Sequence, residues 1–287
     1  MSDCKNIHQK IIKILEKKLN SILPLGNNTL NEAMRYSAIA PGKCIRPMLM
    51  LAVTKSLNGN ISKVITASSA IEIIHTYSLI HDDLPAMDND DYRRGKLSCH
   101  KEYNEAIAIL AGDSLLTLAF EILSNLNYPA EIKCKIINRV AKMIGSIGMA
   151  GGQMLDISFE NKVVSEQEII DMMSKKTGCL FAIAAEISAM LANASLETIA
   201  LYKKFGLNVG ILFQMQDDIL DEISSLEILG KSTGKDRQAG KATLINLLGI
   251  EKAKEKYFER FIFTKDIVSD LPENDYILKF LDYLLPK

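Results

Sequence analysis

The chain has 287 residues, and its 34 basic and 35 acidic residues leave a net charge of -1 at pH 7. This balance gives no indication of nucleic-acid binding, which usually requires an excess of lysine and arginine. Glycine and proline are sparse at 16 and 7 residues, and 48% of the residues are hydrophobic. This composition excludes disordered, collagen-like and turn-rich all-β proteins and favours a helical protein.

Apolar residues recur with helical spacing over six segments, 61–83, 105–125, 131–149, 167–192, 196–222 and 243–262. No stretch alternates polar and apolar residues clearly enough to predict a strand, and no long linker rich in serine, glycine or proline divides the chain. Helix breaks are predicted at Pro41-Gly42, Pro85, 127–129, Gly151-Gly152 and 230–240. We therefore predict an all-α fold, with residues 1–287 forming a single-domain bundle of long helices.

Cysteine usage and hydropathy indicate the compartment. The five cysteines stand singly, without a CxxC pair, which is typical of reduced thiols inside a cell. Segment 106–123 is apolar enough to resemble a membrane span, but Asp113 near its centre would cost about 2.5 to 3.5 kcal/mol in lipid. We expect a cytoplasmic protein without a membrane span, in which this segment is a buried helix.

Two acidic clusters follow apolar helical segments. The first, 81–91, reads HDDLPAMDNDD, and the second, 214–221, reads QMQDDILD. In the second cluster, offsets of 0, 3, 4 and 7 put Gln214 and three aspartates on one face of a helix. Buried carboxylates cost several kcal/mol each unless cations neutralise them. One such cluster is typical of a solvated helix end, but two favour Mg²⁺ shared with a phosphate group, because Mg²⁺ prefers hard oxygen ligands.

Basic residues lie close to these clusters in the sequence or in glycine-containing segments. Each alone is most often a solvated surface charge, but opposite metal-binding carboxylates they suit a polyphosphate, because arginine and lysine both bind phosphate oxygens. No serine, histidine and aspartate arrangement is evident, although a spatial pairing of His75, His81 or His100 stays open. The basic residues are Lys43, Arg46, Arg93, Arg94, Lys96, Lys175, Lys176, Lys231, Lys235 and Lys241.

These motifs resemble those of the trans-prenyl diphosphate synthases, most closely the bacterial farnesyl diphosphate synthases. The similarity covers nearly the whole chain, and the motifs occur in the same order as in that family. The matching segments are GKCIRP at 42–47, HTYSLIHDDLPAMDNDDYRRGK at 75–96, AGDSLLTLAFEIL at 111–123, GMAGGQMLD at 148–156, KTG at 176–178, FQMQDDILD at 213–221 and GKSTGKD at 230–236. The resemblance implies the isoprenoid synthase fold, a bundle of long helices around a central cavity, and a homodimer.

The resemblance also implies roles for individual residues. Three Mg²⁺ ions would be held by the aspartates Asp82, Asp83, Asp88, Asp217, Asp218 and Asp221, with Asp82 and Asp217 also counted as catalytic. The allylic diphosphate would be bound by Arg93, Lys176, Lys231 and Lys241, and isopentenyl diphosphate by Gly42, Lys43, Arg46, His75 and Arg94. Lys176, Thr177 and Gln214 would present oxygen dipoles to the allylic cation.

The implied reaction is the condensation of isopentenyl diphosphate with dimethylallyl or geranyl diphosphate, through Mg²⁺-assisted ionisation of the allylic substrate. Tyr77 and Ser78 lie one helical turn before the first aspartates, where the family places its chain-length gate, and a bulky Tyr77 suggests a fifteen-carbon product. The alternatives are a geranylgeranyl diphosphate synthase with a twenty-carbon product, or a non-catalytic helical subunit of a heteromeric synthase.

Overall fold

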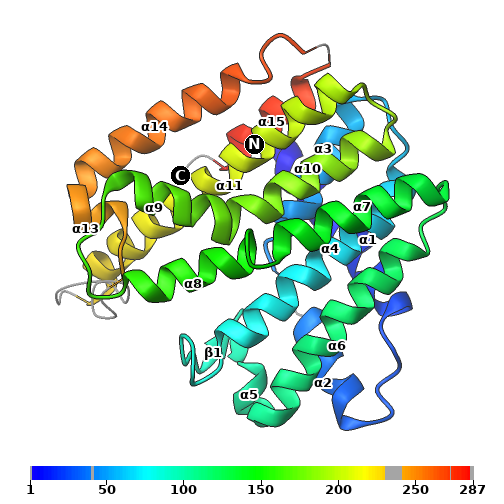
Figure 1. Ribbon diagram of the computed structural model, residues 1–287, viewed down its shortest axis with the longest axis horizontal. Helices are drawn as coiled ribbons and strands as arrows, with labels where there is room; N and C mark the ends of the chain where they lie inside the picture. Colours follow the sequence, from blue (N-terminus) through cyan, green and yellow to red (C-terminus); the bar gives the residue numbers. More distant parts are fainter. Residues whose placement is uncertain (1, 40–41, 230–240, 272, 285–287) are drawn as a thin grey trace. The chain divides into compact units, whose positions relative to one another are not determined.

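The structure is a computed structural model that describes residues 2–39, 42–229, 241–271 and 273–284, with side chains for all of these except 2–7 and 224–229. The chain forms two compact units, residues 1–137 and 138–287. Both are built from helices, which confirms the all-α prediction (Figure 1).

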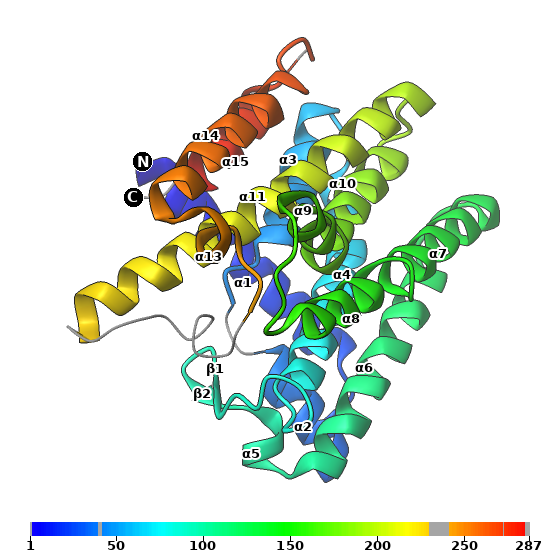
Figure 2. The same ribbon diagram turned by 60° about the vertical axis from the view of Figure 1, so that its left-hand side comes forward.

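The first unit is organised around α4 (Ile61–Asp82), which packs against α3 (Ile45–Ser56) and α6 (Glu105–Ser124). Ile71, Ile73 and Ile74 of α4 are completely buried, so this helix forms the centre of the unit's core. The remaining elements are α1 (Ser2–Ile22), α2 (Thr29–Ala38), β1 (Tyr92–Arg93), β2 (Lys96–Leu97) and α5 (Cys99–Glu102), and Figure 2 shows β1 and β2 as a small hairpin.

The second unit is centred on α10 (Cys179–Leu191) and α11 (Leu196–Leu229), which lie side by side (Figures 1 and 2). Gly206 of α11 permits this close packing, since a Cβ atom there would lie 2.5 Å from the Phe181 carbonyl oxygen. Helix α7 (Ala130–Ile144) crosses the boundary between the units. The other helices are α8 (Met149–Phe159), α9 (Glu166–Met173), the π-helix η1 (Ser174–Gly178), α13 (Leu244–Leu248), α14 (Ile250–Asp266) and α15 (Asp275–Leu284).

The predicted helix breaks at Pro85 and at residues 127–129 are confirmed. Helix α4 ends at Asp82 before Pro85, and α7 begins at Ala130, directly after Pro129. The break predicted at Gly151-Gly152 is wrong, because both glycines lie inside α8. A Cβ atom at Gly152 would lie 2.1 Å from the Lys176 backbone nitrogen, so this glycine allows close helix packing.

Two further expectations need correction. The absence of strands is wrong for residues 92–97, where an antiparallel pair of two-residue strands is too short to show alternation in the sequence. The continuous helix expected over 243–262 is also wrong, because Gly249, with φ of +83°, separates α13 from α14. The break expected at 230–240 lies outside the described residues.

Helix α6 is the one described helix whose length and hydropathy would suffice to cross a membrane. It packs against α4 and α2, but Ile109 and Leu110 on its surface are 44% and 50% exposed. Its Asp113 side chain is 63% exposed. The apolar character of this helix is therefore divided between buried core positions and an exposed face.

Candidate active site

The loop after α4 brings two aspartates of the first cluster close together. Asp83 caps the helix, and the Asp88 backbone N–H donates a hydrogen bond of 2.8 Å to the Asp82 carbonyl oxygen. The next residue, Asn89, has φ of +50°, which turns the chain back. Asp82 and Asp88 are both half-buried. The loop therefore folds back so that Asp88 lies close to Asp82 at the end of α4.

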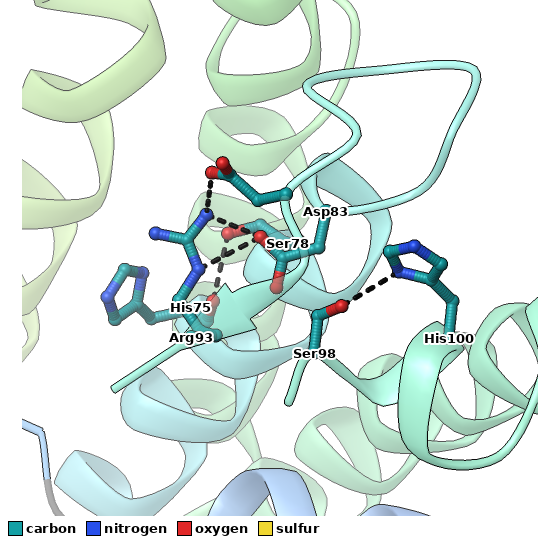
Figure 3. Close-up of polar contacts among 7 residues, drawn as sticks. His75, Ser78, Asp83, Arg93, Ser98 and His100 are labelled. Carbon is teal, nitrogen blue, oxygen red and sulfur yellow. Dashed lines mark hydrogen bonds and ion pairs between the residues drawn. The ribbon is translucent and has the colours of Figure 1, made fainter. Parts of the chain in front are cut away.

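Asp83 points toward Arg93 (Figure 3). The Arg93 Nε donates to Asp83 Oδ1 at 2.9 Å, Nη2 bonds the same oxygen, and Nη2 also donates to Asp90 Oδ2 at 3.0 Å. Asp83 is only 2% exposed, and burial raises its pKa against the opposing effect of Arg93. Asp83 therefore fixes a guanidinium group, a contact that the sequence analysis did not anticipate.

Arg94 occupies the turn of the β1–β2 hairpin. Arg93 pairs with Lys96, so the turn consists of Arg94 and Gly95, with φ of +52° and +76°. Two positive φ values are the conformation of a tight hairpin turn whose twist matches that of the strands. The Arg94 guanidinium then contacts Glu72 of α4, with Nη2 donating to Oε1 at 3.3 Å.

His75 lies on α4 close to several guanidinium groups. Burial, and then nearby positive charge, hold its pKa well below the usual value. The charges come from Arg46, Arg94 and Arg93. A neutral His75 among these arginines can donate one hydrogen bond and accept another, but it adds no positive charge.

The predicted isopentenyl diphosphate residues near the start of α3 are described from Gly42 onward. A Cβ atom at Gly42 would lie 2.7 Å from the Arg94 Cζ, so the guanidinium rests on this glycine. Arg46 is buried at 8% exposure, and the Lys43 carbonyl oxygen lies 2.8 Å from His8 Nε2. The structure thus brings Gly42, His75 and Arg94 together within the first unit.

The predicted chain-length residues lie on the last turns of α4. The Ser78 hydroxyl donates to the His75 carbonyl oxygen at 2.9 Å. The Tyr77 and His81 rings pack edge-to-face, with their centroids 5.9 Å apart. Burial, and then the Asp82 charge, raise the pKa of Tyr77 to about 12. Tyr77 is therefore a neutral, half-buried aromatic side chain directly before the first aspartate cluster.

Four of the predicted site residues of the second unit, Lys176, Gln214, Asp218 and Lys241, line one pocket. Lys176 lies on η1, and its Nζ is 2.5 Å from Asp156 Oδ2 of α8. Asp156 is 7% exposed and belongs to the GMAGGQMLD segment, but the sequence analysis gave it no role. The pocket is lined by Asp156, Met172, Met173, Lys176, Gln214, Asp218, Lys241, Ala242 and Thr243. It therefore combines two lysines with two carboxylates.

A chain of hydrogen bonds orients Gln214. The Thr177 hydroxyl donates to Gln214 Oε1 at 2.9 Å, and Gln214 Nε2 donates to Asp218 Oδ1 at 2.8 Å. Asp217 and Asp221 are half-buried and four residues apart on α11, hence on one helix face. The structure therefore connects Thr177, Gln214 and Asp218 directly. Lys231, which the sequence analysis assigned to the allylic diphosphate, lies outside the described residues.

The donor groups decide whether Mg²⁺ fits this chain. Among the residues that the structure describes, no three histidine, cysteine, aspartate or glutamate side chains come together to hold a metal ion. A backbone hydrogen bond joins Asp88 to Asp82 instead, and Asp217 and Asp221 share one face of α11. One or two carboxylates completed by water and substrate phosphate are the usual environment of Mg²⁺. The chain therefore fits Mg²⁺ that is shared with a phosphorylated ligand.

Comparison with known proteins identifies close relatives. The family model for polyprenyl synthetases matches residues 27–272. The farnesyl diphosphate synthase of Micrococcus luteus is 44% identical over 96% of this chain and 94% of that protein. The geranylgeranyl diphosphate synthase of Cyanophora paradoxa is 43% identical over 84% and 82%. The solved FPP/GFPP synthase of Zymomonas mobilis superposes with a TM-score of 0.87 at 33% identity, covering 98% of both chains.

Proposed function

The chain belongs to the polyprenyl synthetase family, and from this premise we propose that it condenses isopentenyl diphosphate with dimethylallyl or geranyl diphosphate. The observation that carries the proposal is the pocket of the second unit, where Lys176, Lys241, Gln214 and Asp218 meet. Lysines beside carboxylates suit a diphosphate whose remaining charge is neutralised by metal ions.

We assign three Mg²⁺ ions per site to Asp82, Asp88 and Asp217, with Asp83, Asp218 and Asp221 supporting them. When bound, Mg²⁺ would stabilise the charge of a departing diphosphate. Asp83 acts here through Arg93, which it holds by two hydrogen bonds.

The chain's own cations complete the stabilisation of the leaving group. Arg93, Lys176, Lys231 and Lys241 bind the allylic diphosphate, while Lys43, Arg46, His75 and Arg94, with Gly42, bind isopentenyl diphosphate. Cations that are fixed before the reaction lower its barrier, because they do not reorganise as charge develops. Lys176 and Arg93 fit this role, since carboxylates already hold both side chains.

The allylic cation needs oxygen dipoles and no protein nucleophile. Thr177 and Gln214 supply these dipoles, and their mutual hydrogen bond fixes their direction. The double bond of isopentenyl diphosphate attacks the cation to form the new carbon–carbon bond. The released diphosphate then accepts the proton, so that the reaction ends in a longer allylic diphosphate.

We propose farnesyl diphosphate, with fifteen carbons, as the product. Tyr77 supports this choice, because a bulky ring one turn before Asp82 would limit the length of the growing chain. Geranylgeranyl diphosphate is the alternative, and synthases of both products are similar to this chain. A non-catalytic subunit of a heteromeric synthase is less well supported, since this chain retains both aspartate clusters.

We further propose a cytoplasmic homodimer of single-domain chains, without nucleic-acid partners or a membrane span. The exposed apolar residues Ile109 and Leu110 support α6 as the dimer interface. Such a face would be covered by a second copy of the chain instead of lipid. The surface charge of Asp113, in the middle of the same helix, supports this choice over a membrane span.

A product assay tests the function. Purified protein is incubated with isopentenyl diphosphate and either dimethylallyl or geranyl diphosphate, in Mg²⁺ or in EDTA. We expect Mg²⁺-dependent release of diphosphate and a fifteen-carbon product by chromatography. A twenty-carbon product would favour the alternative synthase. Absence of turnover with every primer would contradict the function.

The chain-length proposal has a separate test. Tyr77→Ala removes the ring and opens space below Asp82, so we expect products of twenty carbons or more, measured by chromatography after phosphatase treatment. Tyr92→Ala, which removes a ring that is 69% exposed, is the control and should leave the product distribution unchanged. An unchanged fifteen-carbon product from Tyr77→Ala would remove this role from Tyr77.

A further inference from the structure

We propose that Glu72 is a positioning residue that holds the Arg94 guanidinium in place for the diphosphate of the isopentenyl substrate. The inference rests on the proposed function and assigns a role to a residue outside every motif considered above. Glu72 lies on α4, ten residues before Asp82, and is 3% exposed. A carboxylate this deeply buried is normally paired, and its Oε1 accepts from Arg94 Nη2 at 3.3 Å.

The backbone of the hairpin gives Arg94 little support of its own. Arg94 adopts φ of +52° in the turn, a conformation that residues other than glycine adopt at an energetic cost. The strands on either side have only two residues each and supply few hydrogen bonds. The contact with Glu72 therefore connects a short, strained turn to the central helix of the unit.

Gly42 makes a second contact with the Arg94 guanidinium group. A Cβ atom there would lie 2.7 to 2.9 Å from Cζ, Nη2 and Nε of Arg94, so the guanidinium lies on the glycine surface. Any larger side chain at residue 42 would displace the guanidinium. Contacts with Glu72 and Gly42 together define the direction of Arg94, while its side chain stays 15% exposed.

Electrostatics explain why this partner is a carboxylate. Arg46, Arg93 and Arg94 are all close enough to lower the pKa of His75. Neighbouring positive charges repel one another, and salt screens this repulsion only weakly in a partly buried site. Asp83 and Asp90 offset the charge of Arg93. Glu72 does the same for Arg94, so loss of its charge would favour movement of the guanidinium toward solvent.

The test compares Glu72→Gln with Glu186→Gln in steady-state kinetics. Glu186 is a matched control, because it is 2% exposed and paired with Arg139 and Lys203, neither of which is a proposed site residue. For Glu72→Gln we expect the KM for isopentenyl diphosphate to rise about 10-fold to 100-fold, as for loss of a charged hydrogen bond. The KM for the allylic substrate should change less than twofold, and Glu186→Gln should change neither.

A double variant tests whether Glu72 acts through Arg94. If it does, Glu72→Gln combined with Arg94→Ala should show the same KM as Arg94→Ala alone. Additive effects would overturn the inference, as would an unchanged KM in Glu72→Gln or an equal rise for both substrates. These outcomes require an active wild-type enzyme, so failure of the proposed function is recognised separately.

Folding is monitored for each variant by circular dichroism. If Glu72→Gln is not recovered folded, Glu72→Asp replaces it, since aspartate retains the charge but is shorter by one methylene group. A smaller rise in KM for the same substrate is then expected. An unchanged KM in folded Glu72→Asp would overturn the inference.

Discussion

The two units position their proposed phosphate-binding cations in different ways. In the first unit, Arg93 and Arg94 lie on a hairpin of two-residue strands, where the backbone conformation of residues 94 and 95 directs the side chains. In the second unit, Lys176 lies on the π-helix η1, which continues from α9 into α10 and packs against α8. In both cases a buried carboxylate pairs with the cation, Asp83 with Arg93 and Asp156 with Lys176.

Similar pairs of a cation and a carboxylate are therefore positioned by different structural features in the two units. The hairpin depends on local conformation, since its turn requires two positive φ values in succession. The position of Lys176 on η1 depends on tertiary packing, because the absence of a side chain at Gly152 leaves room for the Lys176 backbone. The first arrangement should therefore respond to changes in backbone strain, and the second to changes in side-chain volume.

The largest effect is expected from removal of the η1 cation. Lys176→Ala should lower kcat/KM about 10² to 10³-fold, as for loss of a charged group that stabilises the leaving group. Lys175→Ala, at an exposed position of the same π-helix, is the control and should change kcat/KM less than about twofold. Equal losses in both variants would show that the π-helix itself, and not the Lys176 charge, is needed.

The packing requirement is tested by Gly152→Ala. The added methyl group would lie 2.1 Å from the Lys176 nitrogen, so α8 and η1 must move apart. We expect a loss of about 1 to 3 kcal/mol in the free energy of unfolding, measured with urea, together with a fall in kcat. Met154→Ala on the same helix, 63% exposed, should change stability by less than about 0.5 kcal/mol. Wild-type stability and activity in Gly152→Ala would contradict the packing argument.

The smallest effect is expected from Gly95→Ala in the hairpin. No atom lies within 4 Å of the added methyl group, but φ of +76° makes alanine unfavourable by about 1 kcal/mol. Gly249→Ala is the control, with φ of +83° and an equally open surrounding, but its ψ of 159° makes alanine still less favourable there. Both variants should lose stability in urea unfolding, Gly249→Ala more than Gly95→Ala, but only Gly95→Ala should raise the KM for isopentenyl diphosphate. A normal KM in Gly95→Ala would show that the turn does not direct Arg94.

The sequence allowed accurate prediction of the long apolar helices. The segments 61–83 and 105–125 match α4 and α6 to within one residue at each end. Both helices begin after an asparagine whose side chain accepts a backbone N–H, a common N-terminal signal. Periodicity could not reveal η1, because Ser174–Gly178 continues the helix from α9 into α10 and differs mainly in hydrogen bonding.

The partners of the predicted cations were harder to predict than the cations. Motif matching identified Arg93, Arg94 and Lys176, but the buried carboxylates that hold Arg94 and Lys176 lie 22 and 20 residues earlier in the chain. One signal was available in each case. Glu72 is an isolated acidic residue within the apolar segment 70–74, and Asp156 ends the GMAGGQMLD segment. A charge at such a position usually requires a partner in the fold.

The π-helix also has a consequence for sequence variation in this unit. Hydrogen bonds from residue i to i+5 accommodate one more residue per turn than an α-helix would, which rotates the helix beyond them by roughly 100°. Helix α9 presents one apolar face, whereas nearly every residue of α10 is buried. The rotation at η1 therefore sets which side of α10 packs against α11, relative to the apolar face of α9. Deletion of a single residue from Ser174–Gly178 would rotate α10 relative to α9 and misalign its packing against α11.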